Sequence, residues 1–100
     1  MDFFQPYMDK IADLCRRHQV ATLYAFGSTV KGGMNENSDV DLLFELKSED
    51  PHEFADNFWA LDEKFEELFG RHVDLISRRA MKNKYFIAQV ESEKVKLYEA

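Results

Sequence analysis

Two aspartates separated by one residue, Asp39 and Asp41, begin an apolar run that ends at Leu46. If this run is a strand, its side chains alternate between faces, so both carboxylates point one way while Val40 points to a core. Carboxylates about 7 Å apart on one strand face can share one or two hard divalent cations. Mg²⁺ uses few protein carboxylates and fills its other positions with water and substrate phosphates. The pair therefore predicts a metal site for a phosphate-bearing substrate.

The dipeptide Gly27-Ser28 ends an earlier apolar run and precedes the aspartates by a gap of ten residues. A glycine there lets the backbone turn sharply and lets a ligand approach closely. Ser28 is predicted to be the N-cap of a short helix over residues 29–31, whose free N–H groups would bind an anion. Together the motifs predict a phosphate cradle facing a metal site. The residues leave open a surface turn followed by an acidic strand edge.

This pattern of Gly-Ser, a ten-residue gap and Asp-x-Asp resembles the signature of the DNA polymerase β-like nucleotidyltransferase superfamily. Within it, the chain resembles the minimal nucleotidyltransferases, the MntA-type antitoxins of HEPN/MNT toxin–antitoxin modules. The resemblance covers nearly the whole chain. It departs just after Ser28, where many relatives have arginines and this sequence reads Thr-Val-Lys-Gly. Lys31 keeps one positive charge there but lacks the bidentate fork of an arginine.

A third aspartate, Asp74, lies in the middle of an apolar run over residues 71–77, where a carboxylate is costly unless something pairs with it. If this run lies beside the strand that carries Asp41, the three carboxylates can share one face. The resemblance then implies that Asp74 is the general base or a ligand of the catalytic metal. The residues alone leave open a helix-capping aspartate, or one paired with Arg71 or Arg78.

The resemblance implies a Mg²⁺-dependent nucleotidyltransferase, with two ions expected, that uses ATP as donor. It further implies a tyrosine of a HEPN-family toxin as acceptor of AMP, so that the protein would act as an antitoxin. The residues implied to hold the metal and act in catalysis are Asp39, Asp41 and Asp74, and those implied to contact phosphates are Gly27, Ser28 and Lys31.

Two other functions stay open at this point. The chain could neutralise a partner by binding alone, which the missing arginines after Ser28 favour and the three aspartates oppose. It could instead be the catalytic half of a two-subunit enzyme that modifies a small molecule, because so short a chain has little room to build an acceptor pocket of its own.

The length of 100 residues predicts one nucleotidyltransferase domain, residues 1–100, with a modest core. A net charge of −6 argues against broad binding to nucleic acid, which needs a basic surface. The sequence contains no run apolar enough to span a membrane and no signal-peptide pattern. The single cysteine, Cys15, fits a cytoplasmic protein, and its place on an apolar helical stripe predicts a core thiol rather than a nucleophile.

Hydrophobic spacing predicts the order helix, strand, short helix, strand, helix, strand, helix and a short terminal edge strand. The predicted ranges are, in chain order, 2–18, 20–26, 29–31, 39–46, 51–69, 71–77, 82–93 and 95–98. Asp2 is expected to cap the first helix, Ser48 or Asp50 the helix that starts at Pro51, and Gly70 to end that helix. This order predicts an α/β, two-layer nucleotidyltransferase fold with a small mixed β-sheet packed against helices.

Other side chains have more than one interpretation. Trp59 lies one position off the apolar stripe of its helix, so it is an aromatic at the core edge or a partner contact. The basic cluster that follows Asp74 is expected to be solvated, although it could reach phosphates or an acidic partner; it consists of Arg78, Arg79, Lys82 and Lys84. No histidine has metal-ligand spacing, so structural or surface roles are predicted for His18, His52 and His72.

Overall fold

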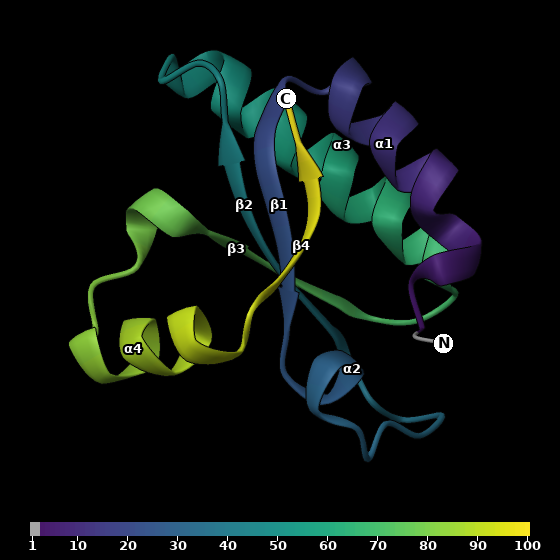
Figure 1. Ribbon diagram of the computed structural model, residues 1–100. Coiled ribbons are helices and arrows are strands. Elements are labelled where there is room, and N and C mark those ends of the chain that lie inside the picture. Colours follow the sequence, from purple (N-terminus) through teal and green to yellow (C-terminus); the bar gives the residue numbers. More distant parts are fainter. Residues whose placement is uncertain (1–2) are drawn as a thin grey trace.

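A four-stranded mixed sheet forms the centre of the structure, a computed structural model that describes residues 3–100 (Figure 1). The strands follow the order β3-β2-β1-β4 across the sheet. β1 is antiparallel to both of its neighbours, whereas β2 and β3 are parallel. The strands are β1 (Val20–Phe26), β2 (Val40–Leu46), β3 (Val73–Ser77) and β4 (Val95–Glu99). The predicted mixed sheet is confirmed, and the short terminal segment is its edge strand.

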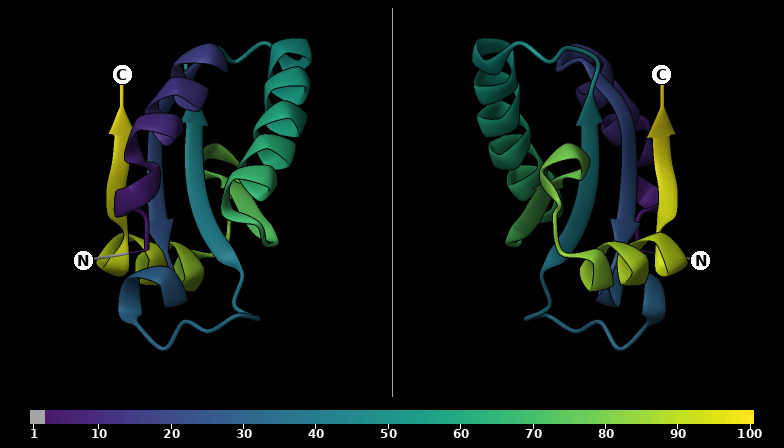
Figure 2. Two further views of the ribbon diagram at one scale, coloured as in Figure 1. Left: turned by 90° about the vertical axis from the view of Figure 1, so that its right-hand side faces the viewer. Right: turned by 90° about the vertical axis from the view of Figure 1, so that its left-hand side faces the viewer.

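Two long helices cover one face of the sheet, and a third lies against the other face (Figure 2). α1 (Met8–Arg17) and α3 (Pro51–Phe69) form the first layer, while α4 (Lys84–Glu93) crosses the opposite face near α2 (Ser28–Lys31). Short 3₁₀ turns precede α1 and follow β3, at Gln5–Tyr7 and Arg78–Ala80. The expected α/β fold is therefore confirmed, with α4 as a partial third layer.

Alternation along β2 divides its side chains between two apolar clusters. Val40, Leu42 and Phe44 are buried in the main core beneath α1 and α3. Leu43 points the other way and packs with Val90 of α4. Since the residues of β2 that alternate with the main core face α4, Asp41 is on the α4 side as well.

The cysteine is part of the main core. Cys15 is fully buried, and desolvation by that burial raises the pKa of its thiol to about 12. A thiol is nucleophilic only as the thiolate, so this residue is a packing side chain, as predicted.

The two ends of α3 have the caps that the sequence predicts. The Asp50 carboxylate accepts hydrogen bonds from the backbone N–H groups of His52 and Glu53 at 2.8 and 3.2 Å, so it is the N-cap of α3. Gly70 ends α3 with a left-handed φ of 66°. The proposed cap Asp2 lies outside the described residues. Among these residues, no helix has the length and hydropathy needed to cross a membrane.

Four elements begin later than predicted. The first helix, predicted over 2–18, is a 3₁₀ turn at Gln5–Tyr7 followed by α1, which begins at Met8. β2 begins at Val40 rather than at Asp39, and β3 at Val73 rather than at Arg71. α4 begins at Lys84 because the Asn83 side chain caps it, accepting hydrogen bonds from two backbone N–H groups.

Candidate active site

The parallel pairing of β2 and β3 places Asp41 directly opposite Asp74, at the second position of each strand. Both residues alternate with buried core side chains, Val40 and Val73, and so share the α4 side of the sheet. Asp39 lies one residue before β2, and its side chain is 54% exposed. The structure thus brings the three predicted carboxylates to one end of the sheet.

The surroundings of Asp41 disfavour the ionised form of its carboxyl group. Desolvation by burial, followed by the negative charges of Asp74, Asp39 and Glu93, raises the pKa of Asp41 to about 6. Neither Asp41 nor Asp74 forms an ion pair with a lysine or arginine within residues 3–100. A bound cation would relieve this repulsion.

Gly27 lies against the Asp41 side chain, because the antiparallel pairing of β1 and β2 places Phe26 opposite Asp41. Its φ of 76° and ψ of −149° belong to a region that essentially only glycine adopts. A Cβ atom at Gly27 would lie 2.2 Å from Asp41 Oδ2. The glycine therefore permits both the turn and the contact between the two sequence motifs.

The helix that follows begins one residue earlier than predicted. Gly27 is the N-cap of α2, and its carbonyl accepts the N–H groups of Val30 and Lys31, both at 3.0 Å. Ser28 is the first residue of the helix, so its prediction as N-cap was wrong. The unusual backbone of Gly27 makes the turn that a capping serine would otherwise make.

A cavity of about 320 Å³ lies over these residues and is closed on its far side by α4. Its lining residues are Phe26, Gly27, Ser28, Lys31, Asp41, Asp74, Ile76, Phe86, Gln89, Val90 and Glu93. The residues from α4 were not predicted. These α4 residues are spaced by three, one and three positions, so they share one face of the helix. That shared face can be read from the sequence, but the cavity that it lines cannot.

Glu93, at the end of α4, contacts two of the predicted phosphate-binding residues, and the sequence did not indicate these contacts. Its Oε1 accepts the Gly27 N–H at 3.1 Å, and its Oε2 lies 2.7 Å from Lys31 Nζ. The hydrogen bond from Lys31 is the largest of the effects that lower the pKa of Glu93. Lys31 is therefore at the cavity, as predicted, but its ammonium group is paired with a carboxylate of the same chain.

His72 is exposed, as predicted, yet it belongs to the site. Its Nδ1 lies 3.3 Å from Asp39 Oδ2, and its Nε2 lies 4.0 Å from Glu66 Oε2. The neighbouring Arg71 donates hydrogen bonds to the carbonyls of Asn35 and Ser38, both at 3.0 Å. Arg71 thus holds the loop before Asp39 rather than pairing with Asp74.

A family model described as a nucleotidyltransferase domain matches residues 8–97. The chain belongs to this family. The match extends from the first residue of α1 into β4 and so includes all the residues of the cavity. The predicted resemblance to nucleotidyltransferases is confirmed.

Three relatives of this nucleotidyltransferase span most of its length. The protein MJ1379 of Methanocaldococcus jannaschii, provisionally named a protein adenylyltransferase, is 27% identical over 94 residues, which cover 86% of this chain and 93% of MJ1379. A solved structure provisionally described as a minimal nucleotidyltransferase has a TM-score of 0.77 and 28% identity, covering 95% of each chain. A crystal structure of a toxin–antitoxin with AMP-PNP has a TM-score of 0.73 and 25% identity, covering 94% of this chain and 74% of that one.

The donor set of this nucleotidyltransferase fits Mg²⁺ better than a softer metal. Within the described part of the chain, no group of three or more His, Cys, Asp or Glu side chains is placed to hold a metal ion. Mg²⁺ does not need such a group, because it binds one or two carboxylates and keeps water and substrate phosphates as its other ligands. The repulsion between the Asp41 carboxylate and Asp74 on the paired strand is suited to such an open site, because a bound cation would offset it.

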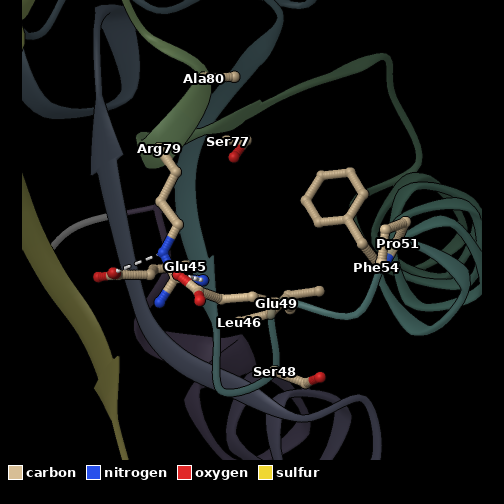
Figure 3. A pocket seen from close by; sticks show the side chains of 9 residues that line it. All are labelled: Glu45, Leu46, Ser48, Glu49, Pro51, Phe54, Ser77, Arg79 and Ala80. Atoms are coloured by element: carbon tan, nitrogen blue, oxygen red, sulfur yellow. Dashed lines mark hydrogen bonds and ion pairs between the residues drawn. The ribbon is translucent and has the colours of Figure 1, made fainter.

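Two members of the basic cluster of the nucleotidyltransferase, Arg78 and Arg79, form ion pairs away from the three carboxylates. A second hollow, of about 400 Å³, lies at the other end of β2, where Arg79 extends toward Glu45 and Glu49 (Figure 3). Arg79 Nε lies 3.2 Å from Glu45 Oε2, and its Nη1 lies 3.5 Å from Glu49 Oε1. Arg78 pairs with Glu91 at 3.4 Å. These two arginines are therefore not free to bind phosphates at the carboxylates.

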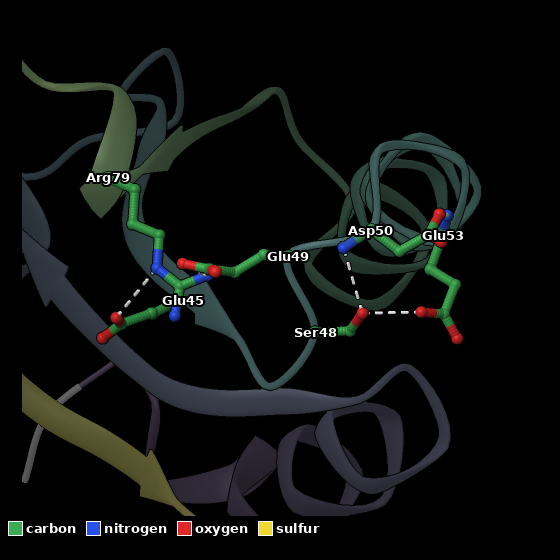
Figure 4. Close-up of polar contacts among 6 residues, drawn as sticks. All are labelled: Glu45, Ser48, Glu49, Asp50, Glu53 and Arg79. Carbon is green, nitrogen blue, oxygen red and sulfur yellow. Dashed lines mark hydrogen bonds and ion pairs between the residues drawn. The ribbon is translucent and has the colours of Figure 1, made fainter.

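Ser48, which also lines this hollow, belongs to a helix-capping arrangement. The Ser48 hydroxyl accepts the Asp50 N–H at 3.1 Å and donates to Glu53 Oε2 at 2.6 Å (Figure 4). Ser48 thus supports the cap of α3 that Asp50 makes. None of the predicted site residues is among the described residues that line this hollow.

Proposed function

We propose that this nucleotidyltransferase transfers AMP from ATP to a hydroxyl group of a partner protein in the cytoplasm, and so acts as an antitoxin. The observation that carries the proposal is the contact between the two motifs, with Gly27 against Asp41 and Asp41 opposite Asp74. The name of MJ1379 and the toxin–antitoxin structure with AMP-PNP support adenylyl transfer from ATP to a protein. We further propose that residues 1–100 act as one nucleotidyltransferase domain.

The chemistry follows from the positions of the side chains. Asp39, Asp41 and Asp74 would hold Mg²⁺, with two ions expected. When bound, the metal would offset phosphate charge and help pyrophosphate leave. Gly27, Ser28 and Lys31 would contact the outer phosphates. These contacts would orient the α-phosphorus toward the acceptor.

Asp74 is the proposed general base. It takes the proton of the acceptor hydroxyl as the acceptor oxygen forms its bond to the α-phosphorus and the bond to the pyrophosphate oxygen breaks. Asp74 is exposed whereas Asp41 is half-buried, so a hydroxyl carried by another protein can approach Asp74 from solvent. The resemblance to the MntA-type antitoxins suggests a tyrosine of a HEPN-family toxin as that acceptor.

The decisive experiment uses the product of the adjacent gene as the candidate acceptor. It is incubated with this protein, ATP and Mg²⁺ and then weighed intact by mass spectrometry. A mass gain of one or more adenylates is expected with the wild-type protein and not with Asp39→Asn/Asp41→Asn. A stable complex without any mass gain would contradict the enzymatic proposal and favour neutralisation by binding.

One observation favours that second candidate, an antitoxin that acts by binding alone. Among the described residues that line the cavity, Lys31 is the only basic one, and it is already paired with Glu93. The two candidates differ in cells that express the toxic partner. Rescue by Asp39→Asn/Asp41→Asn would exclude modification as the means of neutralisation, whereas loss of rescue by a variant that still binds the partner would exclude binding alone.

We further predict that Trp59 is part of the surface that binds the partner protein. Trp59 is 67% exposed on α3, where its ring makes an edge-on contact with Phe58 at 5.2 Å between ring centroids. Tryptophan is enriched among the residues that carry binding energy in interfaces. Trp59→Ala is therefore expected to weaken the complex with the partner by about tenfold or more, measured by isothermal titration calorimetry.

The comparison variant is Tyr85→Ala, which removes another large aromatic that is 77% exposed, from α4 instead of α3. Because α4 lines the cavity to which the acceptor must come, a larger loss of affinity for Tyr85→Ala than for Trp59→Ala would place the interface on the α4 side of the sheet. Equal affinities for the wild type and Trp59→Ala would show that Trp59 lies outside the interface and is an aromatic at the edge of the core.

A further inference from the structure

Glu93 occupies the groups that the proposed function assigns to phosphate. The Gly27 N–H has one hydrogen to donate, and Glu93 Oε1 accepts it at 3.1 Å. Within residues 3–100, Lys31 supplies the only ammonium group at the cavity, and its Nζ lies 2.7 Å from Glu93 Oε2. A carboxylate with two oxygens on an N–H donor and a cation has the contacts that two oxygens of a phosphate would make.

This arrangement is held in place by the structure of α4. The Glu93 side chain is only 11% exposed, whereas Lys31 is 54% exposed. The residue after Glu93, Lys94, continues the helical bonding with its N–H on the Val90 carbonyl at 2.8 Å, and Val90 is fully buried. The packed end of α4 therefore keeps the carboxylate at Gly27 rather than leaving it free in solvent.

The position of Glu93 adds a fourth negative charge close to a site that already needs three carboxylates. The negative charge of Glu93 is one of the effects that raise the pKa of Asp41. Glu93 thus adds to the repulsion among the carboxylates while it neutralises Lys31. An amide side chain could accept the same N–H without adding the charge.

We infer that Glu93 is the affinity-determining residue of the phosphate cradle, and that a nucleotide's outer phosphate binds by displacing this carboxylate from Gly27 and Lys31. The inference rests on the proposed nucleotide site. A carboxylate and a phosphate cannot both accept the one Gly27 N–H, and their like charges repel each other beside Lys31. The charge on Glu93 therefore weakens phosphate binding, and its displacement frees the Gly27 N–H and leaves the charge of Lys31 to the donor phosphates.

The test compares Glu93→Gln with the wild type and with Glu91→Gln. Glu91 lies two residues earlier on α4 and pairs with Arg78 and Lys94, so its variant has the same change in net charge away from the cradle. Tripolyphosphate, which has no nucleobase, and ATP are titrated by calorimetry, in EDTA and again with Mg²⁺. Glu93→Gln is expected to bind tripolyphosphate about tenfold more tightly than the wild type, and Glu91→Gln to bind it as the wild type does.

A purely structural role for Glu93 would give the opposite result. Equal or weaker binding of tripolyphosphate by a folded Glu93→Gln variant, when the wild type binds ATP, would overturn the inference and leave the proposed function standing. Binding of neither ATP nor tripolyphosphate by any variant or by the wild type would overturn both.

The wild type also tests displacement directly. The amide resonance of Gly27 is expected to shift when tripolyphosphate is added, since its hydrogen-bond acceptor changes, and the resonance of Gly33 is expected to stay in place. This measurement does not depend on the folding of any variant. A Gly27 resonance that is unchanged at saturation would overturn the inference.

Discussion

The Asp41→Asn variant is expected to lose nucleotidyl transfer by about a thousandfold and yet, without metal, to unfold at a higher temperature than the wild type. Asp41 has a half-buried carboxylate that faces Asp74, with Asp39 and Glu93 nearby. Those charges are needed to hold a cation, but they repel each other when no cation is bound. Replacing Asp41 with a neutral amide of the same size removes the repulsion together with the metal ligand.

The pH dependence of stability follows from the same group. The folded pKa of Asp41 is about 6, above its ordinary value of 3.8. A carboxyl group with a raised folded pKa contributes stability below its unfolded pKa, and that contribution is lost as pH rises through the folded pKa. In EDTA, the wild type should therefore lose stability relative to Asp41→Asn between about pH 4 and pH 7. Differential scanning calorimetry of both variants at several pH values measures this difference.

Asp39→Asn is the matched control for the stability effect. The Asp39 side chain is 54% exposed and has His72 beside it at 3.3 Å, so its charge is better accommodated than that of Asp41. This variant is expected to lose activity without a comparable gain in melting temperature. A lower melting temperature for Asp41→Asn in EDTA would contradict the argument from charge repulsion, and retained transfer would exclude Asp41 as a metal ligand.

The fold and the three carboxylates could be predicted because their signals are local or periodic. Alternation over the residues after Asp39 gives the face of Asp41, and the apolar run around Asp74 gives a strand that needs a reason for its carboxylate. Parallel pairing of these strands then requires only that they be neighbours. The structure shows that pairing, with Asp41 opposite Asp74.

Glu93 could not be predicted in the same way. Its contact with Gly27 joins residues 66 positions apart, and it depends on how α4 crosses the sheet. No sequence period encodes a crossing angle, and Glu93 taken alone resembles any acidic residue near a helix end. The site of His72 was missed for a related reason, because metal-ligand spacing was the only signal considered and His72 acts on Asp39 instead.

Gly27→Ala is expected to destabilise the protein by about 2–4 kcal/mol and to reduce transfer by about a hundredfold or more. Two costs combine at this position. The backbone, at φ 76° and ψ −149°, lies in a region that is essentially closed to alanine. The new Cβ would also lie 2.2 Å from Asp41 Oδ2, so the Asp41 carboxylate would have to move from its place opposite Asp74. Chemical denaturation and the intact-mass assay measure the two effects.

Gly33→Ala separates these costs. Gly33 has a φ of 78°, close to that of Gly27, but a Cβ there would meet nothing within 4 Å. Its variant should lose about 1 kcal/mol through the backbone alone and keep full activity. Equal losses in the two variants would mean that the contact with Asp41 carries no energy.

The double variant Gly27→Ala/Asp41→Ala completes the argument, because it removes the Asp41 carboxylate that the new Cβ would meet. If the contact is the larger cost, the two substitutions are strongly non-additive, and the double variant is more stable than Gly27→Ala alone. Stability would then return without activity. That result would separate the two roles of Gly27, which turns the chain after β1 and leaves room for the Asp41 carboxylate.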